Sequence, residues 1–262
     1  MTSSIVLITG ASSGIGEATA KLYASRGASI VLLARSQDRL ERVAGEIKQA
    51  GGAASPYPID LADSDAVGEL GPRISRELGT PDILINNAGA GRWLPFLETS
   101  PEEARAMIAV PYLAAFYITR AFLPSMLARG SGNIACITSP ASYLVWPNAS
   151  AYTAARHALA GFTEALRTEM RGKGIAVTLV VLGMVESPYW EHNPGSRDNV
   201  PKATKLLPVL SPERAAKAIY AGVARGSRTV VKPALLRPLF LLNALMPRLV
   251  AAQMRRAPKR NA

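Results

Sequence analysis

Residues 7–17, with the sequence LITGASSGIGE, place three glycines between an apolar run and a stretch of helical spacing. The apolar run at 5–8 is typical of a buried strand, and the pattern at 17–23 predicts a helix that stops near Gly27. A strand, a glycine-rich turn and a helix together place backbone N–H groups around a pyrophosphate. The spacing G-x-x-x-G-x-G therefore predicts a dinucleotide-binding unit, although a glycine turn of this kind can also be only a tight connection.

The composition indicates one globular domain. The chain has 262 residues, of which 48% are apolar, enough to bury one substantial core. Its single cysteine, Cys136, excludes an intrachain disulfide and lies in an apolar run where we expect a core residue. The first strand starts by about residue 4, which leaves no room for a signal peptide, and no uninterrupted apolar run reaches the ~18 residues of a membrane span. We therefore expect a cytoplasmic protein.

The positive charge is concentrated at the end of the chain. The net charge is +11, from 30 basic and 19 acidic residues. Glu213 is the last acidic residue, and 214–262 contains 11 Lys and Arg, so the rest of the chain is balanced. An excess of positive charge confined to the tail does not indicate nucleic-acid binding, and no motif suggests base readout. No His, Cys and carboxylate cluster has metal-ligand spacing, so we expect no metal site.

Seven apolar, β-branched runs alternate with stretches of helical period. Candidate N-caps are Ser36, Ser100 and Ser211, with Ser100 opening a long helix over 101–127. This alternation predicts a Rossmann-type α/β fold: a doubly wound, mainly parallel seven-stranded sheet with helices on both faces and the ligand at the carboxyl ends of the strands. The expected strands are 5–9, 29–33, 55–59, 83–85, 133–138, 176–182 and 229–231.

We interpret 1–232 as a single domain and 233–262 as a basic, apolar C-terminal extension. Within the domain, about 184–210 is rich in Pro and polar residues and too long for an ordinary connector. It predicts a mobile substrate loop over the site, in which His192 is either a substrate contact or, more simply, a solvated histidine.

Several motifs follow one another in a fixed order. They are the glycine turn at 9–16, Asp60-Leu61, Asn-Asn-Ala-Gly at 86–89, and Ser139 thirteen residues before Tyr152. With these motifs the chain resembles the short-chain dehydrogenase/reductase family over almost its whole length. The resemblance implies a Rossmann-fold oxidoreductase that uses NAD(P)(H) and is often a homodimer or homotetramer.

The resemblance also implies which residues hold the cofactor. The glycine turn would line the phosphates, the pair after the third strand would meet the adenine, and 87–89 would pass under the nicotinamide ribose. The residues concerned are Gly10, Ser12, Ser13, Gly14, Ile15, Gly16, Asp60, Leu61, Asn87, Ala88, Gly89, Gly183, Val185 and Ser187, together with Tyr152 and Arg156.

The end of the second strand indicates which dinucleotide is preferred. An acidic residue about 20 positions past the glycine turn would bind a ribose 2′-hydroxyl. Ala34 stands there, followed by Arg35, and an uncharged residue with a guanidinium favours the 2′-phosphate of NADP(H). NAD(H) remains the alternative, because Arg35 can also be a solvated residue and Ser13 adds no second basic group.

The expected catalytic residues differ from the family pattern at one position, in the helix that carries Tyr152. By resemblance Tyr152 would protonate the alkoxide formed by hydride transfer, and Ser139 would hold the carbonyl oxygen by a hydrogen bond. A phenol, with an ordinary pKa near ~10, needs a nearby cation to become more acidic. The family places a lysine four residues on, whereas this chain has Arg156, which keeps the charge but will not shuttle a proton.

A second departure lies in the long helix. Pro111 stands where the family has a catalytic asparagine, so the side-chain amide is lost, and a kink is expected there. Two readings follow. The chain is an NADP(H)-dependent carbonyl reductase or alcohol dehydrogenase with a slower turnover, or it binds the dinucleotide as a sensor or scaffold. Retention of both Ser139 and Tyr152 favours the first.

Aromatic loop residues predict an apolar pocket for a lipid, steroid or other hydrophobic ketone: Trp93, Trp146, Tyr189 and Trp190. In the C-terminal extension Pro238 could open a helix that Pro247 bends. This basic, apolar segment fits two roles equally well, and the two are compatible. It either makes peripheral contact with a membrane surface or caps the pocket or a subunit interface through Leu239, Leu242, Leu245 and Leu249.

Overall fold

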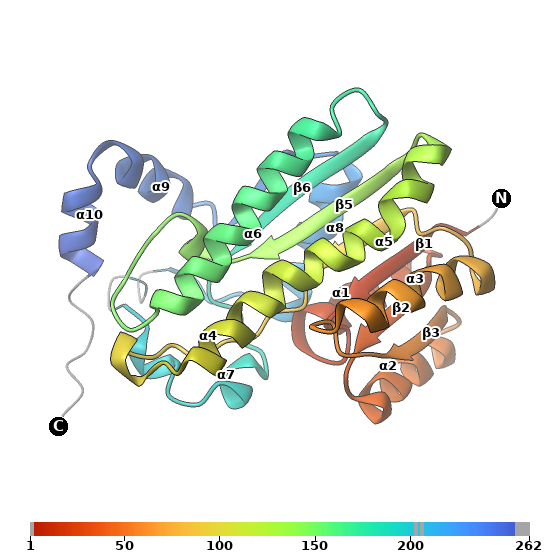
Figure 1. The fold of residues 1–262 in the computed structure, drawn as a ribbon, viewed down its shortest axis with the longest axis horizontal. Coiled ribbons are helices and arrows are strands. Elements are labelled where there is room, and N and C mark those ends of the chain that lie inside the picture. Colours follow the sequence, from red (N-terminus) through yellow and green to blue (C-terminus); the bar gives the residue numbers. More distant parts are fainter. Residues whose placement is uncertain (1–2, 202–203, 205–206, 255–262) are drawn as a thin grey trace.

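The computed structural model describes residues 3–201, 204 and 207–254. In this part of the chain one seven-stranded sheet has the order β3-β2-β1-β4-β5-β6-β7, and every neighbouring pair is parallel (Figure 1). The predicted fold is confirmed. The strands are β1 (Ile5–Thr9), β2 (Ser29–Ala34), β3 (Ala53–Pro58), β4 (Ile83–Asn86), β5 (Gly132–Thr138), β6 (Ile175–Leu182) and β7 (Thr229–Lys232).

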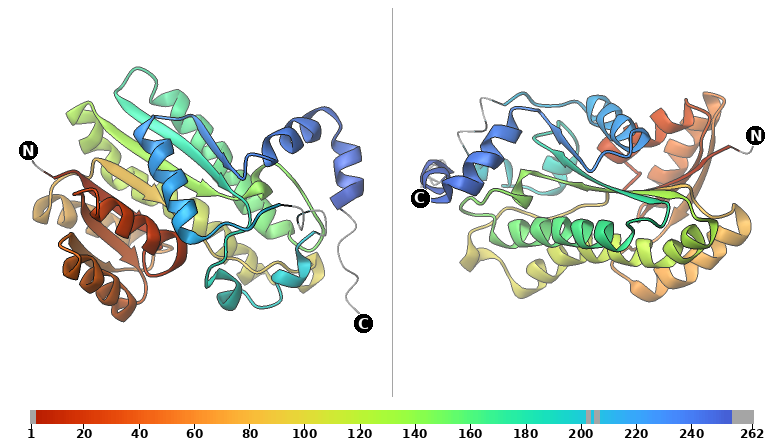
Figure 2. Two further views of the ribbon diagram at one scale, coloured as in Figure 1. Left: turned by 180° about the vertical axis from the view of Figure 1, so that it is seen from behind. Right: turned by 90° about the horizontal axis from the view of Figure 1, so that it is seen from above.

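Helices cover both faces of the sheet (Figure 2, right). One face carries α1, α2 and α8, and the other carries α3, α5 and α6. The helices are α1 (Gly14–Ala24), α2 (Gln37–Gln49), α3 (Ser64–Glu77), α4 (Pro101–Ile108), α5 (Ala114–Arg129), α6 (Ser150–Glu169), α7 (Tyr189–His192), α8 (Pro212–Ala224), α9 (Leu236–Leu245) and α10 (Pro247–Met254).

Burial on both faces explains why the strands read as continuous apolar runs rather than alternating patterns. Along β1, Val6 and Ile8 pack into one core, whereas Leu7 packs into the other, and all three are fully buried. Cys136 on β5 is also fully buried, as expected, and burial raises the pKa of its thiol.

Most predicted boundaries agree with the structure to within two residues. β3 was expected at 55–59 but runs from Ala53 to Pro58, because its pairing with β2 begins at Ala53, where small residues give no apolar signal. Ser36 occupies the N-cap of α2 without a side-chain bond, whereas Ser100 forms a capping box with Glu103.

The predicted helix over 101–127 is interrupted in the middle. α4 ends at Ile108, a π-helical turn η2 (Ala109–Leu113) follows, and α5 begins at Ala114. Val110 has φ −132° and ψ 103°, which are extended values, because a proline disfavours the helical conformation of the residue before it. The break leaves the Val110 carbonyl to accept from the N–H of Ala90, 3.4 Å away, in the loop after β4.

Taken together, Pro101–Arg129 has the length and hydropathy of a membrane span, with a mean hydropathy of 1.5 over 18 residues. In the fold this segment packs against α3, α6 and the sheet. Ile118, Phe122 and Met126 are almost fully buried in the domain core, and 39% of the apolar window is buried in the fold.

The sheet order reverses between β1 and β4, which is where ligands bind in open α/β folds. Thr9 at the end of β1 joins the two strands. Its buried Oγ1 accepts from the N–H groups of Asn87 and Ala88, each at 2.9 Å. The Asn87 side chain in turn donates to the carbonyls of Thr9 and Gly10.

Replacing Thr9 by Val should destabilise the fold, since the N–H of Ala88 loses its acceptor and the N–H of Asn87 keeps only the Ile85 carbonyl. We expect a loss of roughly 2–5 kcal/mol in the free energy of unfolding, measured by urea denaturation. Thr19→Val is the matched control, because its buried hydroxyl donates only to Ile15 of its own helix, and it should cost less than about 1.5 kcal/mol. Equal losses in the two variants would contradict this role of Thr9.

Candidate active site

A cavity of about 1180 Å³ lies at the carboxyl ends of the strands. The predicted site residues come together in its wall, with Gly16 the exception. Those that line it are Gly10, Ser12, Ser13, Gly14, Ile15, Arg35, Asp60, Leu61, Asn87, Ala88, Gly89, Ser139, Tyr152, Arg156, Gly183, Val185 and Ser187.

The glycine turn needs its glycines for two different reasons. Gly10 and Gly14 have φ of +65° and +56°, which other residues rarely adopt. Gly16 lies beneath the turn, where a Cβ would collide with the carbonyl of Gly10, so its position serves packing rather than the cavity wall. Ser13 is the N-cap of α1 but makes no side-chain cap bond. The first N–H groups of α1 are therefore left for an anion.

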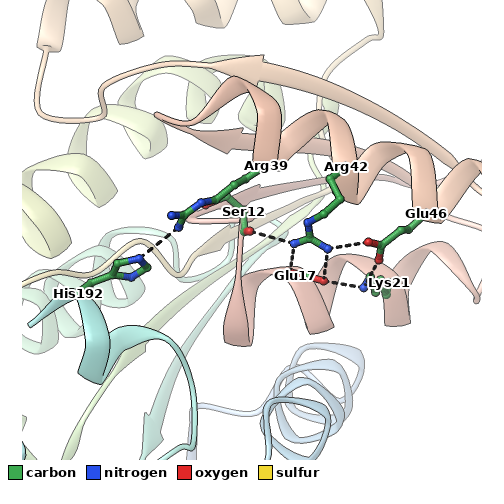
Figure 3. Close-up of polar contacts among 7 residues, drawn as sticks. All are labelled: Ser12, Glu17, Lys21, Arg39, Arg42, Glu46 and His192. Carbon is green, nitrogen blue, oxygen red and sulfur yellow. Dashed lines mark hydrogen bonds and ion pairs between the residues drawn. The ribbon is translucent and has the colours of Figure 1, made fainter.

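An ion-pair network fixes the first turn of α1 from outside the cavity (Figure 3). Glu17 accepts from Arg42 at 2.7 Å and from Lys21 at 2.6 Å, and Arg42 also reaches the Ser12 carbonyl at 3.5 Å. Burial raises the pKa of Glu17, but the hydrogen bonds from Arg42 and Lys21 outweigh it, so the net pKa is lowered. The network thus couples α2 to the glycine turn.

Tyr152 and Arg156 lie one turn apart on α6, and both are buried. The Arg156 guanidinium carbon is 4.9 Å from the centroid of the Tyr152 ring, within the range of a cation–π contact. Its Nη2 lies so near Gly89 that a Cβ there would be at 2.8 Å. The Arg156 Nε is buried without a partner among the described residues. The Arg156 guanidinium is therefore held beside the Tyr152 ring, and its Nε can still donate a hydrogen bond.

Ser142 anchors the start of α6 to the end of β5. Its buried hydroxyl lies 2.6 Å from Oγ1 of Thr138 and donates to the carbonyl of Arg156 at 2.9 Å. Ser139, which follows β5, accepts from the N–H of Ala141 and lines the cavity. The end of β5 thereby sets the position of the helix that carries Tyr152.

Pro111 is buried and does not line the cavity, whereas its neighbours Ala109 and Val110 do. The kink therefore presents backbone and apolar atoms to the cavity at this point. The position offers no side-chain amide.

The segment predicted as a substrate loop, 184–210, borders the cavity and contains α7 and the 3-10 turn η4 (Arg197–Asn199). Three buried polar side chains tie it to the loop after β4. Asn193 accepts from the N–H of Gly91, Ser196 accepts from the N–H of Trp93, and Asn199 donates to the carbonyl of Trp93. Sequence reasoning missed them, because their partners lie about 100 residues away in the chain.

The predicted aromatic residues do line the cavity. The ring of Trp93 lies 5.2 Å from that of Tyr152, 5.1 Å from that of Trp146 and 5.8 Å from that of Trp190. Tyr189 donates to the Gly91 carbonyl at 2.6 Å, and burial raises its pKa, so it stays a neutral donor. The indole Nε1 atoms of Trp93 and Trp146 are buried without partners among the described residues.

A second arginine joins Arg35 at the far end of the cavity. Arg39, one turn into α2, lines the wall and lies 3.2 Å from Nε2 of His192 (Figure 3). This contact connects α2 with α7 across the cavity. Sequence reasoning missed Arg39, because Arg35 precedes the N-cap of α2 and only the packing of the helix brings Arg39 to the same cavity.

The C-terminal extension forms two helices. Pro238 lies in the first turn of α9, which begins at Leu236, and Pro247 opens α10 instead of bending one continuous helix, because a proline fits best at the first helical position. Leu236, Leu239 and Met254 line the cavity. Of the four leucines expected to cap the pocket, Leu239 lines the cavity, Leu242 packs beside Val250, and Leu245 and Leu249 are exposed. The extension therefore borders the cavity, but mostly through residues other than those expected.

A family profile described as short chain dehydrogenase matches residues 4–197. A short chain dehydrogenase of the fungus Pseudocercospora fijiensis is 37% identical over 79% of the chain and 66% of its own length. A fatty acyl-CoA reductase of Acinetobacter baylyi is 36% identical over 86% of the chain and 74% of its own length. The chain spans only 31% of a probable oxidoreductase, EphD, of Mycobacterium tuberculosis, to which it is 36% identical.

Solved structures show the same fold. A short-chain dehydrogenase from Sphingobium yanoikuyae in complex with NADPH has a TM-score of 0.80 and 26% identity, covering 98% of this chain and 99% of its own. An alcohol dehydrogenase from Thermococcus sibiricus complexed with 5-hydroxy-NADP has a TM-score of 0.77 and 28% identity, covering 88% of this chain and 96% of its own.

The lowered pKa of Glu17 predicts an acid-dependent loss of stability. The contribution of this carboxylate is fully present above its ordinary pKa of 4.5 and is lost as the pH falls through the lower folded value. Wild type should therefore exceed Glu17→Gln in free energy of unfolding at neutral pH, and the difference should shrink below pH 4.5. Urea denaturation over a pH series measures it, with the exposed Glu69→Gln as the control. A difference that grows on acidification would contradict the assignment.

Proposed function

The chain belongs to the short chain dehydrogenase family, and on this premise we propose an NADP(H)-dependent oxidoreductase acting on a hydrophobic carbonyl or alcohol. One observation carries the proposal. The buried pair Tyr152 and Arg156 shares a cavity with Ser139 and with the open N-terminus of α1. A phenol, a fixed cation, a hydroxyl and an anion site are the parts that carbonyl reduction needs.

The chain's own residues suit a nicotinamide dinucleotide. The Arg156 guanidinium, whose Nη2 lies beside Gly89, and the free N–H groups of α1 match a ribose and a pyrophosphate. NADPH, when bound, supplies a hydride to the carbonyl carbon. Tyr152 then gives its hydroxyl proton to the resulting alkoxide, while Ser139 donates a hydrogen bond to the same oxygen. The positive charge of Arg156 stabilises the phenolate that remains.

Return of the proton to Tyr152 is the step that this chain handles least well. Arg156 stays protonated and so relays nothing, and Pro111 offers no amide. Turnover should therefore be slower than with lysine and asparagine at these positions. The alternative is a dinucleotide-binding sensor or scaffold. The shared cavity of Ser139 and Tyr152 favours the enzyme, since a pure binder needs neither group.

The pocket supports a hydrophobic substrate with few polar groups. Trp93, Trp146 and Trp190 make it apolar, and the two unpartnered indole N–H groups can each donate to one acceptor. Relatives named fatty acyl-CoA reductase and, in Arabidopsis thaliana, 11-beta-hydroxysteroid dehydrogenase-like 2 agree with a lipophilic substrate class.

Substitution of Tyr152 by Phe removes the proton donor, so NADPH oxidation with a panel of hydrophobic ketones and aldehydes should fall by about 10²–10⁴-fold. Binding of NADPH, followed by nicotinamide fluorescence, should be retained. Arg156→Lys should raise kcat, and Arg156→Lys with Pro111→Asn should raise it further. Wild-type binding without turnover, restored only in the double variant, would support the sensor; no binding of either dinucleotide would contradict both readings.

The preference for NADPH should depend on Arg35 and Arg39. Each guanidinium that meets a 2′-phosphate contributes about 1.5–3 kcal/mol, so Arg35→Ala/Arg39→Ala should raise the KM for NADPH by roughly 100-fold or more. The KM for NADH should change little. Lys48→Ala, an exposed cation on the same helix outside the cavity, is the control. Equal losses for both dinucleotides would argue against a 2′-phosphate site.

A further inference from the structure

The C-terminal helix pair, α9 and α10, carries an exposed apolar surface. This helix pair lies at one end of the molecule, beyond the sheet, in every view (Figures 1 and 2). Large apolar side chains normally avoid such exposure in a cluster. The surface consists of Leu235, Leu241, Leu245, Met246 and Leu249, which are between 45% and 73% exposed.

The opposite side of the pair is packed into the protein. Phe240 stacks on Tyr143 with ring centroids 4.7 Å apart, and Asn243 donates to the Tyr143 carbonyl at 2.8 Å. Leu236 and Met254 are buried and line the cavity. The pair is therefore anchored through its inner side, and the exposed leucines are not needed to hold it in place.

The charge of this region has one sign. Every charged residue after Glu213 is basic, including four in the tail beyond residue 254, which lies outside the described residues. Arg237 and Arg248 are exposed on the helix pair, and within the described part of the chain neither makes an ion pair. Arg237, Leu241 and Leu245 follow at intervals of four, which places them along one side of α9. Unpaired arginines beside exposed leucines suit an apolar layer bordered by negative charge.

We propose that the outer face of the C-terminal helix pair docks on an anionic phospholipid bilayer. The leucines and Met246 enter the boundary between headgroups and acyl chains, and Arg237 and Arg248 meet the lipid phosphates. Because the inner side of the same helices forms a wall of the cavity, docking places the cavity beside the acyl layer. The entry of a hydrophobic substrate from the acyl layer rests on the proposed function, whereas the docking itself does not.

A second copy of the chain fits this surface less well. A standard protein interface uses about 20–30 residues a side, whereas five apolar side chains are exposed here. In a two-fold dimer the same patch meets itself, which would bring Arg237 and Arg248 near their own copies. Neither cation has a carboxylate on this pair of helices to meet, since α9 and α10 contain none.

Sedimentation of the full chain with vesicles tests the proposal without cofactor or substrate. Binding to phosphatidylcholine vesicles with about one third phosphatidylglycerol should be strong, and it should weaken with pure phosphatidylcholine and with salt. Arg237→Gln/Leu241→Ser should lower the partition coefficient by about tenfold or more. The matched control is Arg76→Gln/Leu78→Ser, an exposed arginine and leucine at the C-terminal end of α3, which should change nothing. Circular dichroism checks that both variants fold.

Two results would overturn the proposal: wild type that does not bind anionic vesicles, and equal loss of binding in the test and control variants. If wild type does not bind vesicles but is an oligomer by light scattering that Arg237→Gln/Leu241→Ser dissociates, the surface is an interface between copies. Failure of ketone reduction alone would leave vesicle binding intact and so would count against the proposed function only.

Discussion

The close approach between the glycine turn and the loop after β4 is the constraint on which the rest of the site depends. A Cβ at Gly10 would lie 2.9 Å from the Cα of Ala88, so only glycine lets the two backbones meet. Thr9 and Asn87 then join the two segments by hydrogen bonds on both sides of the contact. This contact aligns the N-terminus of α1 with the segment that carries Gly89. The anion site and the position of the Arg156 guanidinium are thereby fixed relative to each other.

A second constraint, at Pro111, shapes the opposite wall. The proline forces Val110 out of the helix, and the freed carbonyl of Val110 accepts from Ala90 in the loop that contains Gly89. Pro111 therefore maintains a backbone connection between the kink and the loop beside the cavity. This explains how the fold accommodates a buried proline in the middle of a long helix.

The sequence was sufficient to predict the features that depend on residues close together in the chain. The positions of the strands follow from apolar runs, and the residues around the cavity follow from motifs of short spacing that resemble those of a known family. Contacts between segments far apart in the chain could not be predicted in the same way. Asn193 and Ser196 show their role only when the loop is folded back on Gly91 and Trp93. Arg39 reads as a solvated helix residue until α2 is seen to border the cavity.

Arg156, which stands where the family resemblance implies a lysine, is packed against Tyr152. The guanidinium is planar and weakly hydrated, so it can rest near the ring at 4.9 Å in a buried site that also holds Trp93 against the phenol. An ammonium group would be a more compact charge that exchanges protons. The contact of the guanidinium with the ring, together with the packing of Trp93, holds Tyr152 in a defined orientation toward the cavity that both residues line. The geometry of the pair is therefore set by the fold before any ligand binds.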